Sequence, residues 1–364
     1  MALHIGIVGL PNVGKSTLFN ALTRTRGAQA ANYPFCTIEP NVGVVEVTDP
    51  RLQALAALVH PEKVIPAAIE FVDIAGLVRG ASKGEGLGNQ FLAAIREADA
   101  ICEVVRLFPG SNVTHVEGSV DGKRDRETVE TELCLADLDA LERRLEKVRG
   151  AARTGDKEKQ RELALMEKIL ASLKTGQLAF HTDLSPEERF FAHSFQLLTF
   201  KPIIYAANVG EQELHQMSAH HVRELLGLPD TAKIIVLSAK IEEDLQELSP
   251  EEAQEFLRSL SVSSSGLDQL IHAAYDTLGY QTFFTAGPEE VRAWTMHKGG
   301  TAPQAAGVIH SDFEKGFIRA ETIAYEDYVQ FGGEQKAKEA GKMRSEGKDY
   351  VVHDGDVMHF RFSP

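Results

Sequence analysis

The sequence predicts an α/β protein in which a mostly parallel sheet carries an inserted antiparallel helical hairpin and is followed by a small β-rich domain. Three observations predict this organisation. Short apolar, β-branched runs alternate with helical segments in residues 1–125 and again in residues 197–280, as in a parallel sheet with crossover helices. In residues 126–196 the strands stop and leucines recur at helical spacing. Residues 281–364 return to short strand-like runs between Gly and Asp turns, which suits a β-grasp domain.

Composition bounds the class of protein. The 364 residues suit two or three domains, and the 43% hydrophobic and 25% charged fractions are ordinary globular values. The 38 basic and 53 acidic residues give a formal net charge of −15. This balance excludes a protein that coats nucleic acid over its whole surface, so such a partner must be met by a local basic patch.

Cysteine usage and hydropathy predict a cytoplasmic protein. The three cysteines lie far apart, which argues against a disulfide framework or a structural zinc site. No apolar run approaches the roughly 18–20 residues of a membrane span. Residues 1–8 lack the basic start of a secretory signal. We therefore expect no membrane partner and no recognition of DNA sequence.

The first element is a strand at Ile5–Val8, which runs into Gly9–Thr17 and then into a helix at Leu18–Leu22. The middle segment matches GxxxxGK[ST], in the strand-to-helix context that a phosphate-binding loop requires. Its glycines permit a tight loop whose N–H groups point at phosphate oxygens. Lys15 is placed to reach the β- and γ-phosphates, and the Ser16 hydroxyl to ligate Mg²⁺.

The next strand, Ala67–Asp73, ends in the pattern DxxG. Asp73 is placed to hold the Mg²⁺ shell through water, and the Gly76 N–H to sense the γ-phosphate. Between the two motifs, Thr37 is placed to be a second hydroxyl ligand of Mg²⁺. Taken alone, Asp73 could equally be a helix cap, and Thr37 could equally be an ordinary strand residue. In this order and spacing, the motifs together predict a nucleotide hydrolase of the switch type.

Three further strands complete the predicted sheet: Ala100–Arg106, Pro202–Asn208 and Ile234–Lys240. Asn208 begins Asn-Val-Gly-Glu, where related GTPases carry Asn-Lys-x-Asp, and the last strand ends in Ser-Ala-Lys at Ser238. Glu211 is one methylene longer than the aspartate that accepts two hydrogen bonds from guanine, and Val209 replaces the lysine that packs on the base. We therefore expect ATP to be preferred over GTP. A GTPase that tolerates the glutamate is the alternative.

The water-positioning group is not at its usual place, because Leu77 follows the DxxG motif instead of glutamine. Intrinsic hydrolysis should be slow unless another group substitutes. Candidates are Arg79 and Lys83, in a Gly-rich segment, and His115, in a polar loop. The side chain of Asn12 is placed to help hold a monovalent cation such as K⁺ against the phosphates; its alternative role is a hydrogen bond within the loop.

The motifs together resemble the YchF/Obg-like ATPases, and the likeness runs from Leu3 to the C-terminus. It is carried by residues 9–17, 32–41, 73–78 and 208–211. The resemblance implies ATP hydrolysis, a helical insertion, a C-terminal TGS domain, and association with ribosomes in translation or stress regulation. It also implies His115 as the group that orients water, Mg²⁺ at Ser16 and Thr37, and the main chain of Val209 at the base. The nucleotide contacts it implies in the loop are Asn12, Val13, Gly14, Lys15, Ser16 and Thr17.

The insertion contains two apolar stripes with the spacing of amphipathic helices. They are Leu138, Leu141, Leu145 and Val148, then Leu163, Met166, Leu170 and Leu173. Between Arg143 and Arg161 lie eight basic and three acidic residues, a local charge of +5. Such a run is either a solvated face or a contact site for RNA or a ribosome. The basic segment 332–344 of the C-terminal domain has three possible roles: a solvated surface, a contact with RNA, or closure over the other domains.

Two functions remain open on the sequence. One is an ATPase whose slow hydrolysis is a timing event. The other is a non-enzymatic switch module that uses ATP or GTP only to dock its basic hairpin on a ribosome.

Overall fold

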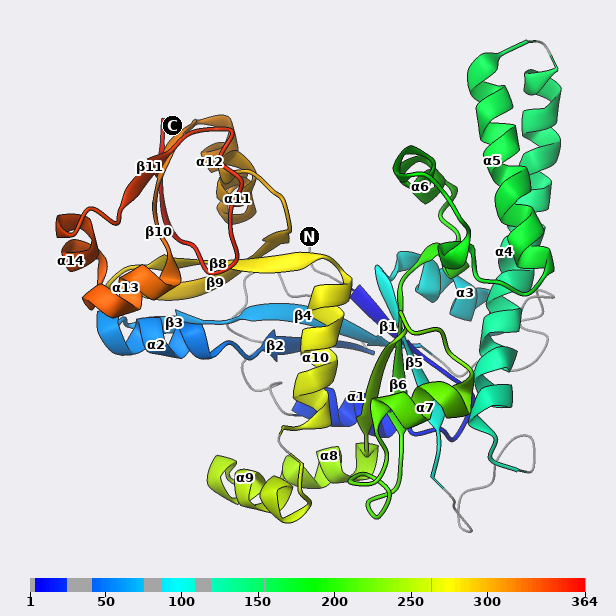
Figure 1. Cartoon of the computed structure of the whole chain (residues 1–364), viewed down its shortest axis with the longest axis horizontal. Helices are drawn as coiled ribbons and strands as arrows, with labels where there is room; N and C mark the ends of the chain where they lie inside the picture. Colours follow the sequence, from blue (N-terminus) through cyan, green and yellow to red (C-terminus); the bar gives the residue numbers. More distant parts are fainter. Residues whose placement is uncertain are drawn as a thin grey trace. The chain divides into compact units, whose positions relative to one another are not determined.

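The computed structural model describes residues 4–24, 41–74, 87–108, 119–153, 155–262 and 264–363 (Figure 1). These residues divide into two compact units. The first unit holds the described residues of Met1–Val44 and Glu70–Ala273, and the second holds those of Val45–Ile69 and Ala274–Pro364.

The first sheet has six strands in the order β2-β4-β1-β5-β6-β7, and its neighbours from β4 to β7 are parallel. The strands are β1 (His4–Val8), β2 (Val42–Val47), β4 (Ala67–Asp73), β5 (Ala100–Arg106), β6 (Ile203–Asn208) and β7 (Lys233–Leu237). All seven residues of β5 are buried, as expected for a central parallel strand that is covered on both faces. The predicted α/β class and mostly parallel sheet are confirmed.

Helices connect and cover these strands. They are α1 (Lys15–Arg24), α3 (Leu87–Glu97), α4 (Gly122–Ala152), α5 (Lys157–Lys174), α6 (Pro186–Ala192), α7 (Ala219–Leu226), α8 (Ala239–Leu245), α9 (Pro250–Ser259) and α10 (Gly266–Thr277). Their starts follow local chemistry: Asp121 and Asp156 accept backbone N–H groups at the first turns of α4 and α5, and Ser185 and Ser249 form capping boxes. In the described part of the chain, no helix is both long and apolar enough to cross a bilayer.

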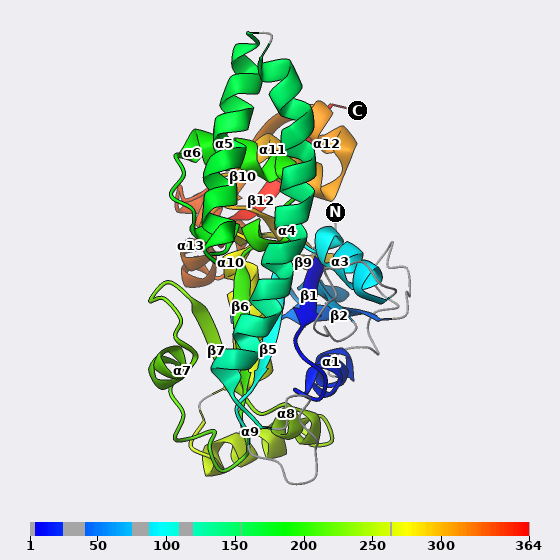
Figure 2. The same ribbon diagram turned by 90° about the vertical axis from the view of Figure 1, so that its right-hand side faces the viewer.

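Helices α4 and α5 lie side by side in Figures 1 and 2 and form the helical hairpin. Helix α4 begins at Gly122, earlier than the expected boundary at 126. Of its expected stripe, Leu141, Leu145 and Val148 are buried and Leu138 is partly buried. The stripe of α5 is shifted from the expected one. Its buried positions are Leu165, Met166, Ile169 and Leu173, while Leu163 and Leu170 are partly buried at its margin.

A buried polar cluster joins the N-terminal part of α4, here called the root of α4, to the first sheet. The Tyr205 hydroxyl of β6 donates to Glu130 Oε1 of α4 at 2.7 Å, and Arg126 Nη1 donates to Glu130 Oε2 at 3.0 Å. Glu103 of β5 is 1% exposed, and neither of its carboxyl oxygens has a hydrogen-bond partner among the described residues. Burial, together with the neighbouring Glu130, raises the pKa of Glu103 well above its usual range, against the opposing charge of Arg126. This shift favours the protonated form of the Glu103 carboxyl.

The second sheet has the order β11-β10-β12-β8-β9-β3. Its strands are β3 (Lys63–Ile65), β8 (Tyr280–Ala286), β9 (Glu290–His297), β10 (Phe317–Ile323), β11 (Arg344–Glu346) and β12 (Val357–Phe362). Its helices are α11 (Ala302–Ile309), α12 (Ser311–Lys315), α13 (Tyr325–Phe331) and α14 (Glu334–Glu339). The last strand, β12, lies inside the sheet, antiparallel to β10 and parallel to β8, which is the β-grasp arrangement expected for this part of the chain.

The second unit also contains a segment from the first half of the sequence. Helix α2 (Pro50–Val59) packs on β8 and β9, and β3 pairs with β9 in parallel. In α2, Arg51 donates to both carboxyl oxygens of Asp49 and to Asp354 Oδ2, and its guanidinium lies 5.3 Å from the centre of the Phe284 ring. The sequence predicts that residues 45–69 belong to the domain formed by 1–125 and 197–280. In the structure, β3 of this segment pairs with β9, while β2 and β4 at its two ends belong to the first sheet.

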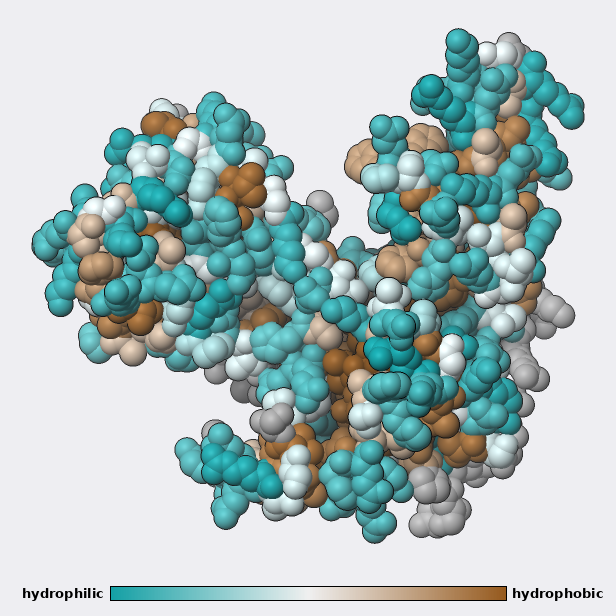
Figure 3. Space-filling view, viewed as in Figure 1, coloured by the Kyte–Doolittle hydropathy of each residue, from teal (hydrophilic) through white to brown (hydrophobic). Residues whose placement is uncertain are grey.

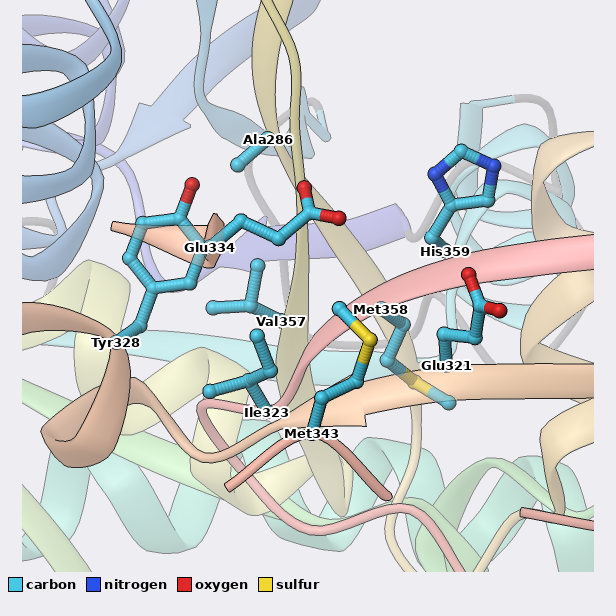
Figure 4. A pocket seen from close by; sticks show the side chains of 9 residues that line it. All are labelled: Ala286, Glu321, Ile323, Tyr328, Glu334, Met343, Val357, Met358 and His359. Carbon is cyan, nitrogen blue, oxygen red and sulfur yellow. The ribbon is translucent and has the colours of Figure 1, made fainter. Parts of the chain in front are cut away.

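A small pocket lies in the second unit, beside β10, β12 and α13 (Figure 4). Its volume of about 10 Å³ suits about one water molecule. The lining residues are Ala286, Glu321, Ile323, Tyr328, Glu334, Met343, Val357, Met358 and His359. None of them is a residue that the sequence motifs single out.

Candidate nucleotide-binding site

The predicted phosphate loop joins β1 to α1, and two glycines give it its shape. Gly9 has a φ of +149° and Gly14 a φ of +101°. A Cβ at Gly9 would lie 2.6 Å from the Val104 carbonyl oxygen, and a Cβ at Gly14 would lie 2.2 Å from the Asn208 amide nitrogen. Both positions therefore need glycine for its backbone conformation and for the close approach of neighbouring strands.

Lys15 is the first residue of α1, and its side chain is buried. Its ammonium donates to the carbonyl of Leu10 at 2.7 Å, so it lies against the backbone of the loop. Burial lowers the pKa of Lys15 to about 8, against the attraction of Asp73. A cation in such a low-dielectric position interacts strongly with a bound anion.

Ser16 and Asp73 come together at the carboxyl ends of β1 and β4. The Ser16 hydroxyl donates to Asp73 Oδ2 at 3.4 Å. Burial raises the pKa of Asp73, while Lys15 and Ser16 act in the opposite direction. One hydroxyl and one carboxylate are hard oxygen donors of the kind that Mg²⁺ takes. The residues present therefore fit a magnesium ion.

Asn208, at the end of β6, ties the loop to the next helix. Its amide nitrogen donates to the Val13 carbonyl at 2.9 Å, and its amide oxygen accepts from the Ala239 N–H at 3.0 Å. Ser238 is buried at the N-cap position of α8. Asn208 and Ser238, predicted from separate motifs, thus lie at one place beside the loop.

The two altered positions of the base motif differ in exposure. Val209 is 1% exposed, and its N–H donates to the Leu237 carbonyl at 2.9 Å, so its side chain lies in the core. Glu211 is exposed in the turn that follows β6.

The remaining predicted residues of the loop are placed as follows. Thr17 is half-buried in α1, and Asn12 is exposed, with a left-handed φ of 62°. Thr37, Gly76 and His115 lie outside the described residues, as do Leu77, Arg79 and Lys83.

Sequence reasoning missed Arg106, the last residue of β5. Its side chain is 0% exposed. Nη1 donates to the Asn12 carbonyl and Nε to the Phe108 carbonyl, both at 3.3 Å, and the guanidinium lies 4.3 Å from the centre of the Phe108 ring. The available signal was an arginine that ends an apolar strand, at the sheet edge where ligands of parallel sheets bind.

Two family models match the chain. One, described as 50S ribosome-binding GTPase, matches residues 4–142, and the other, named YchF-GTPase_C and described as a protein of unknown function (DUF933), matches residues 280–363. A solved structure of the Schizosaccharomyces pombe YchF GTPase is 39% identical, with a TM-score of 0.89, and the match covers 99% of this chain and 97% of that one.

Bacterial relatives match over the whole length. Proteins named ribosome-binding ATPase YchF are 54% identical over 367 residues in Bacillus subtilis (strain 168), 56% over 364 residues in Haemophilus influenzae and 54% over 364 residues in Escherichia coli O157:H7. Each match covers 100% of this chain and 100% of the relative. The family resemblance that the motifs predicted is confirmed, and the chain belongs to the YchF family.

Proposed function

We propose that this protein is a Mg²⁺-dependent ATPase switch that hydrolyses ATP slowly and binds ribosomes in the cytoplasm. The observation that carries the proposal is the meeting of Lys15, Ser16 and Asp73 at the end of the sheet, in the loop that Asn208 braces. Full-length similarity to proteins named ribosome-binding ATPase supports the choice of substrate and partner.

The proposed roles follow from the chemistry of each group. The Lys15 ammonium and the loop N–H groups stabilise the negative charge of the phosphates. Ser16, Thr37 and Asp73 hold Mg²⁺, which when bound neutralises phosphate charge. The N–H of Gly76 senses the γ-phosphate, and His115 orients the attacking water. Thr37, Gly76 and His115 lie outside the described residues; the sequence motifs support the roles of Thr37 and Gly76, and the family resemblance supports that of His115.

Base preference and the monovalent cation rest on single residues. Glu211 is one methylene longer than the aspartate that clamps guanine, so its carboxylate no longer has the spacing needed for the two hydrogen bonds to that base. ATP is therefore preferred over GTP. Val209 is buried in the structure, and the contact of its main chain with the base rests on the family resemblance. Asn12, exposed at the turn of the loop, helps hold K⁺ against the phosphates.

The ribosome contact is proposed at the far end of the hairpin, where Figure 3 shows a mostly hydrophilic surface. Within the hairpin, Arg143 pairs with Asp139, Arg144 and Lys159 with Glu162, and Arg149 with Glu167. Between residues 143 and 161, the exposed cations with no ion-pair partner among the described residues are Lys147, Arg153, Lys157 and Arg161. Part of the +5 charge is thus neutralised locally, and the unpaired part is available to RNA phosphates.

The basic segment 332–344 offers less to RNA. Lys342 pairs with Asp327 at 3.1 Å, and Arg344 pairs with Glu346 and Asp356. We therefore propose the hairpin as the main contact and the C-terminal domain as a secondary one.

Single-turnover hydrolysis tests the enzymatic proposal. The protein is mixed with radiolabelled ATP or GTP and Mg²⁺, with and without ribosomes, and binding of each nucleotide is measured by calorimetry. We expect ATP to bind more tightly and to be hydrolysed, faster when ribosomes are present. Binding of GTP as tight as that of ATP refutes the base preference, and absence of hydrolysis in every condition refutes the enzyme.

Charge reversal tests the ribosome contact. Arg153→Glu combined with Lys157→Glu removes two unpaired cations, and we expect ribosome co-sedimentation to weaken and its dependence on salt to fall. Arg143→Glu combined with Arg149→Glu changes the charge by the same amount at two ion-paired positions, and is the matched control. No loss of co-sedimentation in the Arg153/Lys157 variant returns the tip to a solvated face, and equal losses in the two variants refute the special role of the unpaired cations.

A second candidate function is a GTP-using or dual-specificity switch that docks on the ribosome without catalysis. The specific observation in its favour is that the solved relative from Schizosaccharomyces pombe is described as a GTPase. The same experiment separates the two: ribosome binding that depends on nucleotide but proceeds without hydrolysis selects this second function.

A further inference from the structure

Two successive carbonyl groups of the phosphate loop are held by side chains from two neighbouring strands. The Asn12 carbonyl accepts from Arg106 Nη1 at 3.3 Å, and the Val13 carbonyl accepts from Asn208 Nδ2 at 2.9 Å. Arg106 and Asn208 are partners in the register of β5 and β6, and the Leu107 N–H donates to the Asn208 carbonyl at 2.8 Å. The sheet edge therefore presents two donors to the loop at adjacent positions.

Each of these contacts fixes the orientation of a whole peptide plane. A trans peptide is planar, so its C=O and its N–H point in opposite directions. Arg106, by holding the Asn12 carbonyl, turns the Val13 N–H away from the sheet edge. Asn208, by holding the Val13 carbonyl, does the same for the Gly14 N–H. These N–H groups belong to the segment whose amides bind phosphate in loops of this sequence pattern.

The Asn12 peptide needs such a restraint. Asn12 has a φ of 62°, a conformation that costs free energy for any residue with a Cβ, although asparagine tolerates it better than most. On the next residue, the Val13 side chain is 1% exposed and fixed in the core. The peptide plane between Asn12 and Val13 can still rotate when the two residues are held in this way. The hydrogen bond from Arg106 opposes that rotation.

Burying Arg106 costs free energy, which indicates that its guanidinium has a role other than filling volume. A guanidinium with no exposed surface loses its hydration, and an apolar side chain would fill the same volume more cheaply. What an apolar side chain cannot supply is a fork of N–H donors that reaches two backbone carbonyls at once. Arg106 uses that fork on Asn12 and Phe108, with the Phe108 ring as its support.

We propose that Arg106 is a positioning residue for nucleotide binding: it locks the Asn12–Val13 peptide so that the Val13 N–H stays available to the phosphates. This inference rests on the proposed nucleotide-binding function. It adds to the brace from Asn208 a second and independent one, made by a residue that no sequence motif singles out.

The test is the affinity of folded variants for ATP and ADP, measured by calorimetry with Mg²⁺. Arg106→Met keeps the apolar volume and removes the donors, and we expect the Kd for both nucleotides to rise about 10- to 100-fold, the worth of one hydrogen bond to a charged group. Arg106→Lys keeps one donor and should recover part of the loss. The ratio of ATP to GTP affinity should not change, because the contact concerns phosphates and not the base.

A second buried arginine supplies the matched control. Arg126→Met removes a guanidinium from the cluster at the root of α4, away from the loop. We expect it to lower the melting temperature, as we also expect for Arg106→Met, yet to leave the nucleotide Kd within about twofold of the original chain. A loss of affinity as large in Arg126→Met as in Arg106→Met, or a Kd in Arg106→Met that matches the original chain, overturns the proposal.

If the Arg106 variants do not fold, Phe108→Ala carries the test. It removes the half-buried ring under the guanidinium but leaves the Phe108 carbonyl in place, and the expected rise in Kd is about threefold to tenfold. An unchanged Kd in this variant overturns the proposal. Failure of the original chain to bind ATP or GTP is a different result, because it refutes the proposed function itself.

Discussion

The Ser16 hydroxyl lies 3.4 Å from Asp73 Oδ2, although the two residues are 57 positions apart in the sequence. The contact joins the end of the phosphate loop to the end of β4, and it brings two oxygen donors of different charge to one point. Lys15 is close enough to this point to oppose the rise that burial causes in the pKa of Asp73. The three residues therefore form one electrostatic unit.

We predict that Asp73→Asn raises the Mg²⁺ concentration needed for half-maximal ATP hydrolysis by about 10- to 100-fold, because the amide keeps the shape of the carboxylate but loses its charge. The measurement is ATP turnover across a Mg²⁺ titration. Asp183→Asn, at an exposed carboxylate of the insertion, is the control and should leave the titration unchanged. A Mg²⁺ midpoint in Asp73→Asn equal to that of the original chain contradicts the proposed role.

A second prediction concerns the base. Glu211→Asp should lower the ratio of the GTP Kd to the ATP Kd by about tenfold, because the shorter carboxylate restores the spacing that clamps guanine. Val209 is left unchanged, since a lysine at this buried position would place a charge in the core. Competition binding with both nucleotides measures the ratio, and Glu213→Asp, in the same turn, is the control. An unchanged ratio would mean that the base preference comes from elsewhere.

The phosphate loop could be predicted because its chemistry is local. Gly9, Gly14 and Lys15 are each required by the backbone of one short segment, so the pattern and the geometry carry the same information. The hairpin was predictable in kind for the same reason, but the phase of α5 was not. Leu165 and Ile169 fill the buried face in place of Leu163 and Leu170, and the choice among these apolar residues depends on packing against α4.

What the sequence could not reveal depends on long-range pairing. Residues 45–69 join the second unit because β3 adds to the edge of β9, and no local pattern in β3 names that partner. The role of Arg106 could not be predicted because its acceptors are backbone carbonyls, which every residue has and no sequence pattern marks. Thr37, Gly76 and His115 lie outside the described residues, so their roles stay predictions.

The buried carboxyl of Glu103 gives a prediction on pH. In the native state it holds its proton at pH values where the unfolded chain has released it, so the free energy of unfolding falls as pH rises above the ordinary glutamate pKa of about 4.3. Glu103→Gln removes this penalty. We expect the variant to be more stable than the original chain at pH 7.5, by about 1–3 kcal/mol, and of similar stability near pH 4.5.

Thermal or urea unfolding at the two pH values measures the difference. Glu146→Gln, at an exposed position of the same hairpin, should change stability little at either pH. Glu130 and Arg126 act on the charge of Glu103, and Tyr205 is its register partner on β6. A gain that is equal at both pH values would point to relief of packing, and a loss at pH 7.5 would contradict a protonated carboxyl.

The last prediction tests whether Arg51 stabilises the second unit. It donates to Asp49 and Asp354 at 2.7 Å each, with 26% of its side chain exposed, so Arg51→Leu should cost about 1–2 kcal/mol after solvent screening. Hydrogen exchange should quicken in β8 and β9 and stay unchanged in β1 and β5. Arg319→Leu, at a more exposed ion pair of the same unit, is the control and should cost about 0.5 kcal/mol or less. Faster exchange in β1 and β5 would instead assign Arg51 to the stability of the first unit.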